Sequence, residues 1–149
     1  MPLHEITTTD YSSLQDEKKP RKTLRREKIW QGRVMALVDD LIELSQEQEP
    51  VSRQYTTHPG AVAVVVLRGE AGREEILIEK QYRHPIGGEL WEIPAGLLDI
   101  DGEDYLIAAQ RELAEETDMA AHRWDVLVDF FTTPGGCTES IRIFLARDV

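Results

Sequence analysis

Residues 95–119 read AGLLDIDGEDYLIAAQRELAEETDM and predict the one clear helix of the chain. Acidic residues crowd its expected start, a position that favours negative charge: Asp99, Asp101 and Asp104. Apolar residues follow at helical spacing and form one stripe: Leu106, Ala109 and Leu113. We therefore predict a helix that runs to about Thr117 and packs this stripe against a core.

Three glutamates lie close together on this helix, at Glu112, Glu115 and Glu116. At about 100° per residue they fall within an arc of about 100°, beside the apolar stripe. Like charges at this spacing cost roughly a few tenths of a kcal/mol each. A divalent cation such as Mg²⁺ would reverse this cost, because carboxylate oxygens are its preferred ligands. Taken alone, however, the run is more typical of a solvated helix face.

Strand patterns lie on both sides of the helix. Residues 61–67, AVAVVVL, form a continuous β-favouring run that predicts a central strand buried on both faces. Gln31 and Gly32 predict the turn of an N-terminal hairpin over residues 28–44. The other expected strands lie within residues 51–58, 75–82, 89–94, 124–131 and 141–146.

This order of elements predicts an α/β chain of the α+β type, with a mixed sheet and a helix packed on it. A mixed sheet with two apolar faces needs a second helical layer, yet the sequence stops at Val149 directly after a strand. Either a partner covers that face or the chain is truncated before a C-terminal helix, and we favour truncation. We expect a flexible leader over 1–22, an N-terminal β region over 23–57 and the main domain over 58–149.

The composition limits the partners. With 28 acidic and 17 basic residues, the formal charge of −11 disfavours nucleic acid and anionic membranes. An acidic protein that handles phosphates is expected to recruit divalent metal. The single Cys137 excludes an intramolecular disulfide, and the chain contains neither a signal peptide nor about 18 uninterrupted apolar residues. We therefore expect a cytoplasmic protein.

The stretch quoted above resembles the box of the Nudix hydrolases, GX5EX7REUXEEXGU, where U is a bulky aliphatic residue. Seven positions match in register: Glu103, Arg111, Glu112, Leu113, Glu115, Glu116 and Met119. Two positions depart from it. Six residues instead of five separate Gly96 from Glu103, and Asp118 replaces a glycine. Asp tolerates the left-handed conformation common at a helix end, so the second departure is expected to cost little stability.

The resemblance implies a Nudix-type α/β/α sandwich and a set of roles. Glu112 and Glu116 would bind Mg²⁺, for which Mn²⁺ could substitute, and Glu115 would be a further or alternative ligand. Ala95 would add its backbone carbonyl. Glu103 and Arg111 would form a structural ion pair that holds the loop to the helix.

Outside the box, residues 26–149 resemble the ADP-ribose pyrophosphatases of this family. The resemblance rests on the N-terminal strands and on three segments: HPGAVAVV, EKQYRHP and LWEIPAG. It implies a homodimer formed through the N-terminal strands, and substrate contacts from Arg83, Arg53 and Glu139. Arg83 and Arg53 could instead be paired surface arginines, and Glu139 could belong to an ordinary Pro-Gly turn.

The implied reaction is hydrolysis of ADP-ribose to AMP and ribose 5-phosphate. Two alternatives stay open: a Nudix hydrolase of another nucleoside diphosphate derivative, such as a nucleotide sugar, dinucleoside polyphosphate or oxidised nucleotide, and a non-catalytic Nudix ligand-binding domain. The intact glutamates argue against the last alternative, because binding alone does not need them. The family often places its catalytic base on a loop beyond the last strand found here.

Overall fold

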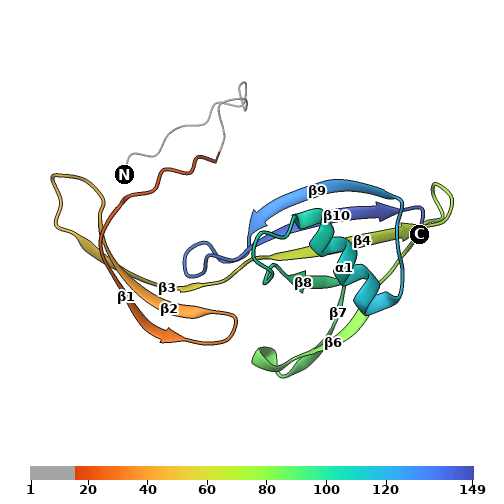
Figure 1. Cartoon of the computed structure of the whole chain (residues 1–149), viewed down its shortest axis with the longest axis horizontal. Coiled ribbons are helices and arrows are strands. Elements are labelled where there is room, and N and C mark those ends of the chain that lie inside the picture. Colours follow the sequence, from red (N-terminus) through yellow and green to blue (C-terminus); the bar gives the residue numbers. More distant parts are fainter. Residues whose placement is uncertain (1–15) are drawn as a thin grey trace.

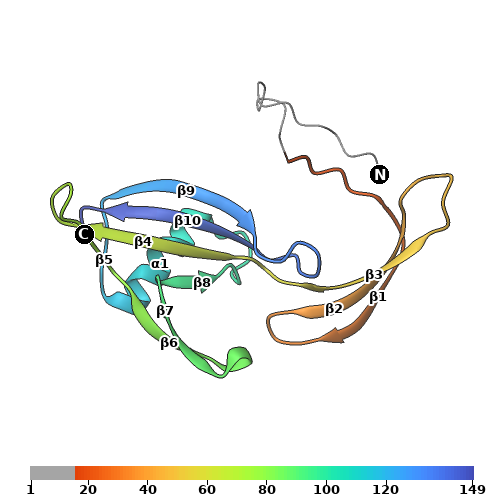
Figure 2. The ribbon, with the colours of Figure 1, turned by 180° about the vertical axis from the view of Figure 1, so that it is seen from behind.

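The chain forms three β-sheets and one α-helix over residues 16–149, the part that this computed structural model describes. Figures 1 and 2 show from opposite sides that the three N-terminal strands form a separate sheet beside the part that carries the helix. The elements are β1 Lys22–Gln31, β2 Ala36–Glu43, β3 Val51–Thr57, β4 Ala61–Arg68, β5 Glu75–Ile76, β6 Glu79–Arg83, a 3-10 turn His84–Ile86, β7 Gly88–Glu92, β8 Ala95–Leu97, α1 Tyr105–Thr117, β9 Arg123–Phe131 and β10 Ser140–Arg147.

The N-terminal sheet is antiparallel, in the order β1-β2-β3, so the predicted N-terminal β region is confirmed. The Gly32 N–H closes the hairpin turn by donating to the Met35 carbonyl at 2.8 Å. β1 begins at Lys22, six residues before the predicted start at residue 28. The added residues are mostly charged and exposed, so backbone pairing with β2, not an apolar pattern, defines them. Of the predicted leader, residues 1–15 lie outside the described part, and 16–21 contain neither strand nor helix.

The main sheet has the strand order β5-β4-β10-β9, which makes β4 the central strand that the sequence predicts. β4 and β10 run parallel, with Ile141 opposite Ala61, whereas β9 is antiparallel to β10. The other edge of β4 pairs with β8 near its start and with β5 near its end. The predicted mixed sheet is therefore confirmed, and β8 is held beside the strand on which α1 packs.

The core lies between α1 and one face of this sheet. Val62 and Val64 of β4 are fully buried, as are Ala109 and Leu113 of the predicted apolar stripe. Phe144 of β10 completes the same cluster. Burying a Val, Leu or Phe side chain contributes about 1.5–3 kcal/mol, so this packing fixes where α1 lies.

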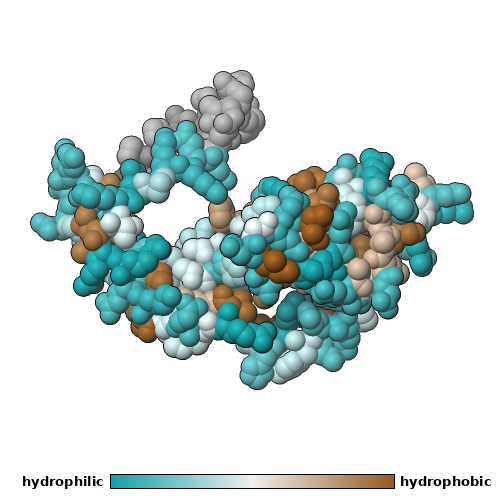
Figure 3. Space-filling model, in the orientation of Figure 1, coloured by the Kyte–Doolittle hydropathy of each residue, from teal (hydrophilic) through white to brown (hydrophobic). Residues whose placement is uncertain are grey.

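Within residues 16–149, α1 is the one α-helix, so no second helix covers the opposite face of the sheet. Val128 and Phe130 of β9 pair with β10 and remain 44% and 41% exposed. Figure 3 shows hydrophobic patches of this kind, in brown, between larger hydrophilic areas on one side of the molecule. No helix in the described part of the chain is both long and apolar enough to cross a membrane.

Two details differ from the prediction. The single strand expected over residues 75–82 is divided, because β5 pairs with β4 whereas β6 turns away to pair with β7 (Figure 2). The three-residue strand β8 was not predicted. Both differences matter for the site, since β6, β7 and β8 all contribute to it.

Candidate active site

Both ends of α1 are capped, which holds its glutamates in place. At the start, the Asp104 side chain accepts a hydrogen bond from the Leu106 N–H at 2.8 Å. At the end, Asp118 adopts the left-handed conformation with φ 55° and ψ 24°, and its N–H donates to the Ala114 carbonyl at 3.0 Å. The prediction that aspartate can replace the family's glycine here is therefore confirmed.

Arg111 connects the loop before α1 to the helix. Its Nε and Nη2 donate to the two carboxylate oxygens of Glu103 at 3.1 and 3.0 Å, and the Glu103 side chain is only 9% exposed. This confirms the structural ion pair that the resemblance implies. The remaining nitrogen, Nη1, lies 2.5 Å from Glu112 and 3.5 Å from Glu115. One arginine thus holds three acidic side chains.

Glu112 lies directly against β8. A Cβ atom added to Gly96 would come within 1.8 Å of the Glu112 carboxyl carbon, a distance that real Cβ atoms essentially never show. Only glycine leaves room for this approach. The Glu112 carboxylate is therefore held next to Ala95, the residue expected to offer its carbonyl.

Glu116 reaches the same strand from the next turn of the helix. It accepts a hydrogen bond from the Ala95 N–H at 3.2 Å. Its outer side is exposed to solvent, yet burial beside β8 raises its pKa, and the charges of Glu79 and Glu112 raise it further. A cation at this position would relieve both effects.

The donor set fits a hard divalent cation. Glu112 and Glu116 both approach the backbone of Ala95 and Gly96, so two carboxylates, which are ligands that Mg²⁺ favours, lie beside one strand. Within residues 16–149, no three His, Cys, Asp or Glu side chains are already gathered in a metal-binding arrangement. Glu112 is instead hydrogen-bonded to Arg111, and Glu116 to Ala95. The Glu115 side chain is 62% exposed, and its one ion pair among the described residues is with Nη1 of Arg111 at 3.5 Å.

Arg83 is the last residue of β6, and its guanidinium binds Glu92, the last residue of β7. Its Nε donates to the two carboxylate oxygens of Glu92 at 2.9 and 3.1 Å, and its Nη2 also donates to Glu92. Glu92 is the main cause of the raised pKa of Arg83, and the charges of Glu79 and Glu116 add to it. Among the described residues, no hydrogen bond or ion pair joins Arg83 to Glu79 or Glu116. Sequence reasoning missed Glu79 and Glu92, although their opposed positions in a β6–β7 hairpin could have indicated them.

Arg53 and Glu139 contact residues other than Arg83 and the glutamates of α1. Arg53 lines a cavity of about 420 Å³ between the N-terminal sheet and the loop at residues 134–138. Glu139 accepts a hydrogen bond from the Thr132 hydroxyl at 2.7 Å and lies 3.5 Å from Nδ1 of His58. Among the described residues, neither makes a hydrogen bond or ion pair with Arg83 or with the glutamates of α1. The printed contacts thus join Glu112 and Glu116 to β8, whereas Arg83 binds Glu92.

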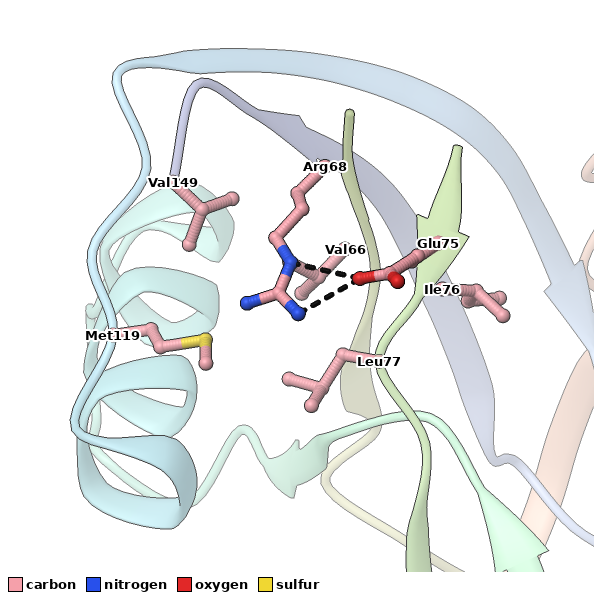
Figure 4. Close-up of a pocket in the computed structure, with 7 residues that line it drawn as sticks. All are labelled: Val66, Arg68, Glu75, Ile76, Leu77, Met119 and Val149. Atoms are coloured by element: carbon pink, nitrogen blue, oxygen red, sulfur yellow. Dashed lines mark hydrogen bonds and ion pairs between the residues drawn. The ribbon is translucent and has the colours of Figure 1, made fainter. Parts of the chain in front are cut away.

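A further cavity of about 260 Å³ lies at the far end of β4 (Figure 4). Val66, Leu77 and Met119 line it, as do Arg68 and Glu75, which are joined by hydrogen bonds of 3.0 and 2.7 Å. None of the predicted site residues lines this cavity. The acidic edge beside β8 is therefore the stronger candidate for chemistry.

Comparison with known proteins places the chain in a family. A family model for the NUDIX domain matches residues 57–149, more than half of the chain, so the protein belongs to the Nudix family. A solved structure of an ADP compounds hydrolase shares the fold, with a TM-score of 0.66 at 21% identity over 90% of this chain and 70% of that one.

Among curated relatives, the ADP-ribose pyrophosphatase of Mycobacterium tuberculosis is 41% identical, over 84% of this chain and 58% of that protein. The ADP-ribose pyrophosphatase of Bacillus subtilis is 37% identical, over 86% of this chain and 66% of its own length. The methanol dehydrogenase activator of Bacillus methanolicus is 40% identical, over 85% and 65%. The chain thus spans 58–66% of the length of these three relatives.

Proposed function

We propose that the protein hydrolyses the pyrophosphate bond of ADP-ribose, giving AMP and ribose 5-phosphate in a Mg²⁺-dependent reaction. The observation that carries the proposal is the acidic edge where Glu112 and Glu116 meet β8. The choice of substrate is supported by two curated relatives named ADP-ribose pyrophosphatase.

Each site residue receives a role in this proposal. Glu112, Glu116 and the Ala95 carbonyl hold the cation, and Glu115 is a further or alternative ligand. A bound Mg²⁺, or Mn²⁺ in its place, would activate water and neutralise charge that develops on the phosphates. Arg83 suits a diphosphate because a guanidinium can donate two hydrogen bonds to it.

Arg53 and Glu139 are proposed to contact the substrate in a homodimer. The N-terminal sheet carries exposed apolar side chains at its hairpin, where Ile29 is 49% and Trp30 56% exposed. Burying these side chains against a second copy would be favourable. It would also allow residues of the N-terminal sheet to serve the site of the partner copy. Light scattering should show a dimer of the wild-type chain and a monomer of Trp30→Glu. A monomeric wild type would contradict this arrangement. The cytoplasmic location stays a prediction, supported by the single Cys137.

The decisive experiment replaces Glu116 by Gln, which keeps the size of the side chain and removes its charge. We expect no AMP release from ADP-ribose with Mg²⁺, together with an unchanged melting temperature. Glu70→Gln, in the exposed turn after β4, is the matched control and should remain active. Unchanged activity of Glu116→Gln would exclude the metal assignment.

Two other functions are separated by the same assay. If the chain turns over nucleotide sugars, dinucleoside polyphosphates or oxidised nucleotides but releases no AMP from ADP-ribose, it is a Nudix hydrolase of another substrate. If it binds nucleotides and hydrolyses none of them, it is a ligand-binding domain.

A further inference from the structure

The loop between β9 and β10 is joined by hydrogen bonds to the end of β3 (Figure 1). The Thr56 N–H donates to the Gly136 carbonyl at 2.9 Å, and the Thr138 N–H donates to the Thr56 carbonyl at 3.0 Å. The Thr138 hydroxyl also accepts a hydrogen bond from the His58 N–H at 2.9 Å. Because these bonds fix the path of the loop, they also fix the backbone of the next residue, Glu139.

The Glu139 carboxylate is held by one of its two oxygens. Oε2 accepts a hydrogen bond from the Thr132 hydroxyl at 2.7 Å, and the Thr132 N–H donates to the Glu139 carbonyl at 3.3 Å. The other oxygen, Oε1, lies 3.5 Å from Nδ1 of His58 and accepts no hydrogen bond from a described residue. No buried side-chain oxygen in the described part of the chain lacks a partner, so Oε1 is open to solvent.

His58 cannot donate to Oε1 while its ring is neutral. Its side chain is 8% exposed, and its Nδ1 accepts a hydrogen bond from the Gly60 N–H at 3.1 Å. A neutral imidazole has one donor and one acceptor nitrogen, so this bond assigns the ring proton to Nε2. The lone pair of Nδ1 therefore faces Oε1, and neither atom can donate to the other. Oε1 is thus an acceptor that is left open for a donor from a ligand.

We propose that Thr132 is a positioning residue: by holding Oε2, its hydroxyl directs Oε1 of Glu139 to a hydroxyl group of the substrate. This inference rests on the proposed function, because it requires Glu139 to contact ADP-ribose. A carboxylate repels a diphosphate but accepts hydrogen bonds from hydroxyl groups, which ADP-ribose carries on both of its ribose units. Without the Thr132 hydroxyl, the carboxylate can rotate away from the substrate.

The first test measures KM and kcat for AMP release from ADP-ribose with Mg²⁺. Thr132→Val keeps the shape of the side chain but removes the hydroxyl. We expect it to raise KM about tenfold and to leave kcat nearly unchanged, since a contact remote from the reacting phosphates is lost. A loss of folded enzyme would instead lower kcat. Thr132→Ser, which keeps the hydroxyl, should restore most of the wild-type KM. Thr133→Val is the matched control and should keep the wild-type KM, because Thr133 is adjacent and exposed.

A double variant shows whether Thr132 acts through Glu139. Glu139→Ala removes the carboxylate that the Thr132 hydroxyl holds. Adding Thr132→Val to Glu139→Ala should therefore leave KM unchanged. If the tenfold rise in KM persists in this background, Thr132 acts in another way and the inference is wrong.

Glu139→Gln gives a second test that does not depend on the folding of a Thr132 variant. Because Nδ1 of His58 is an acceptor, the new amide NH₂ should face His58, and the amide oxygen should accept from the Thr132 hydroxyl. The substrate then meets a donor in place of an acceptor, so KM should rise as much as in Glu139→Ala. A wild-type KM in Glu139→Gln, together with a raised KM in Glu139→Ala, would overturn the inference.

The outcomes separate this inference from the function on which it rests. If Thr132→Val keeps the wild-type KM while Glu139→Ala raises it, only this inference fails. If Glu139→Ala also keeps the wild-type KM, the proposed substrate contact of Glu139 fails together with the inference. If the wild-type chain releases no AMP from ADP-ribose, the proposed function itself fails.

Discussion

Replacing Gly96 by Ala should abolish activity with little loss of stability. The new Cβ would lie 1.8 Å from the Glu112 carboxyl carbon, whereas ordinary contact begins at 3.4 Å, so the carboxyl must move away by about 1.6 Å. The atoms displaced are the end of a flexible side chain, and an unfavourable rotamer costs about 0.5–1.5 kcal/mol. The chemistry is far more sensitive, since a misplacement of about 1 Å can cost about 100-fold in rate.

Two measurements check this expectation. AMP release from ADP-ribose with Mg²⁺ should fall about 100-fold or more in Gly96→Ala, while urea denaturation should show a loss of about 1.5 kcal/mol at most. Glu70→Gln, in the exposed turn after β4, is again the control and should remain fully active. Gly96→Ala with the same activity as Glu70→Gln would refute the placement of Glu112 at the site. If Gly96→Ala loses activity because the protein unfolds, the expectation of a local displacement of the Glu112 carboxyl is refuted as well.

Three further predictions concern the scaffold. Leu113→Ala should lower the free energy of unfolding by about 2–5 kcal/mol in chemical denaturation, because Leu113 is fully buried. Asp118→Gly should raise the melting temperature slightly, since glycine adopts the left-handed conformation at φ 55° without cost. Hydrogen bonds from Arg26 lower the pKa of Asp40 from 3.8 to about 2, so the stabilisation is complete above pH 3.8 and lost as the pH falls through about 2. Asp40→Asn should therefore weaken the pH dependence of stability in that window, measured by denaturation at stepwise pH.

The elements whose buried apolar residues follow a regular spacing could be predicted from the sequence. The run at residues 61–67 became β4, and the apolar stripe of α1 faces the core at Ala109 and Leu113. In both cases the information is local, because a regular spacing along the chain determines which side chains are buried. The ion pair of Glu103 with Arg111, by contrast, was expected only because the segment resembles the Nudix box.

The remaining features depend on partners far apart in the sequence. β8 has three residues and exists because β4 pairs with it, so its own pattern is too short to indicate a strand. Asp40 is 3% exposed, although a charged residue in a strand usually predicts an exposed position. It is buried because Arg26 of β1 and Tyr55 of β3 satisfy its carboxylate from both sides. The pairing of Arg83 with Glu92 likewise requires the β6–β7 hairpin to form first.

The three glutamates of α1 are equivalent in the sequence pattern but not in the structure. Arg111 already balances Glu112, at 2.5 Å, and water can solvate Glu115, which is 62% exposed. Glu116 makes no ion pair in the described part of the chain, and burial beside β8 raises its pKa. A cation gains most where a negative charge is partly removed from water and makes no ion pair. Glu116 is therefore the ligand on which metal binding should depend most, and its neutralisation tests the proposed function more sharply than that of Glu115.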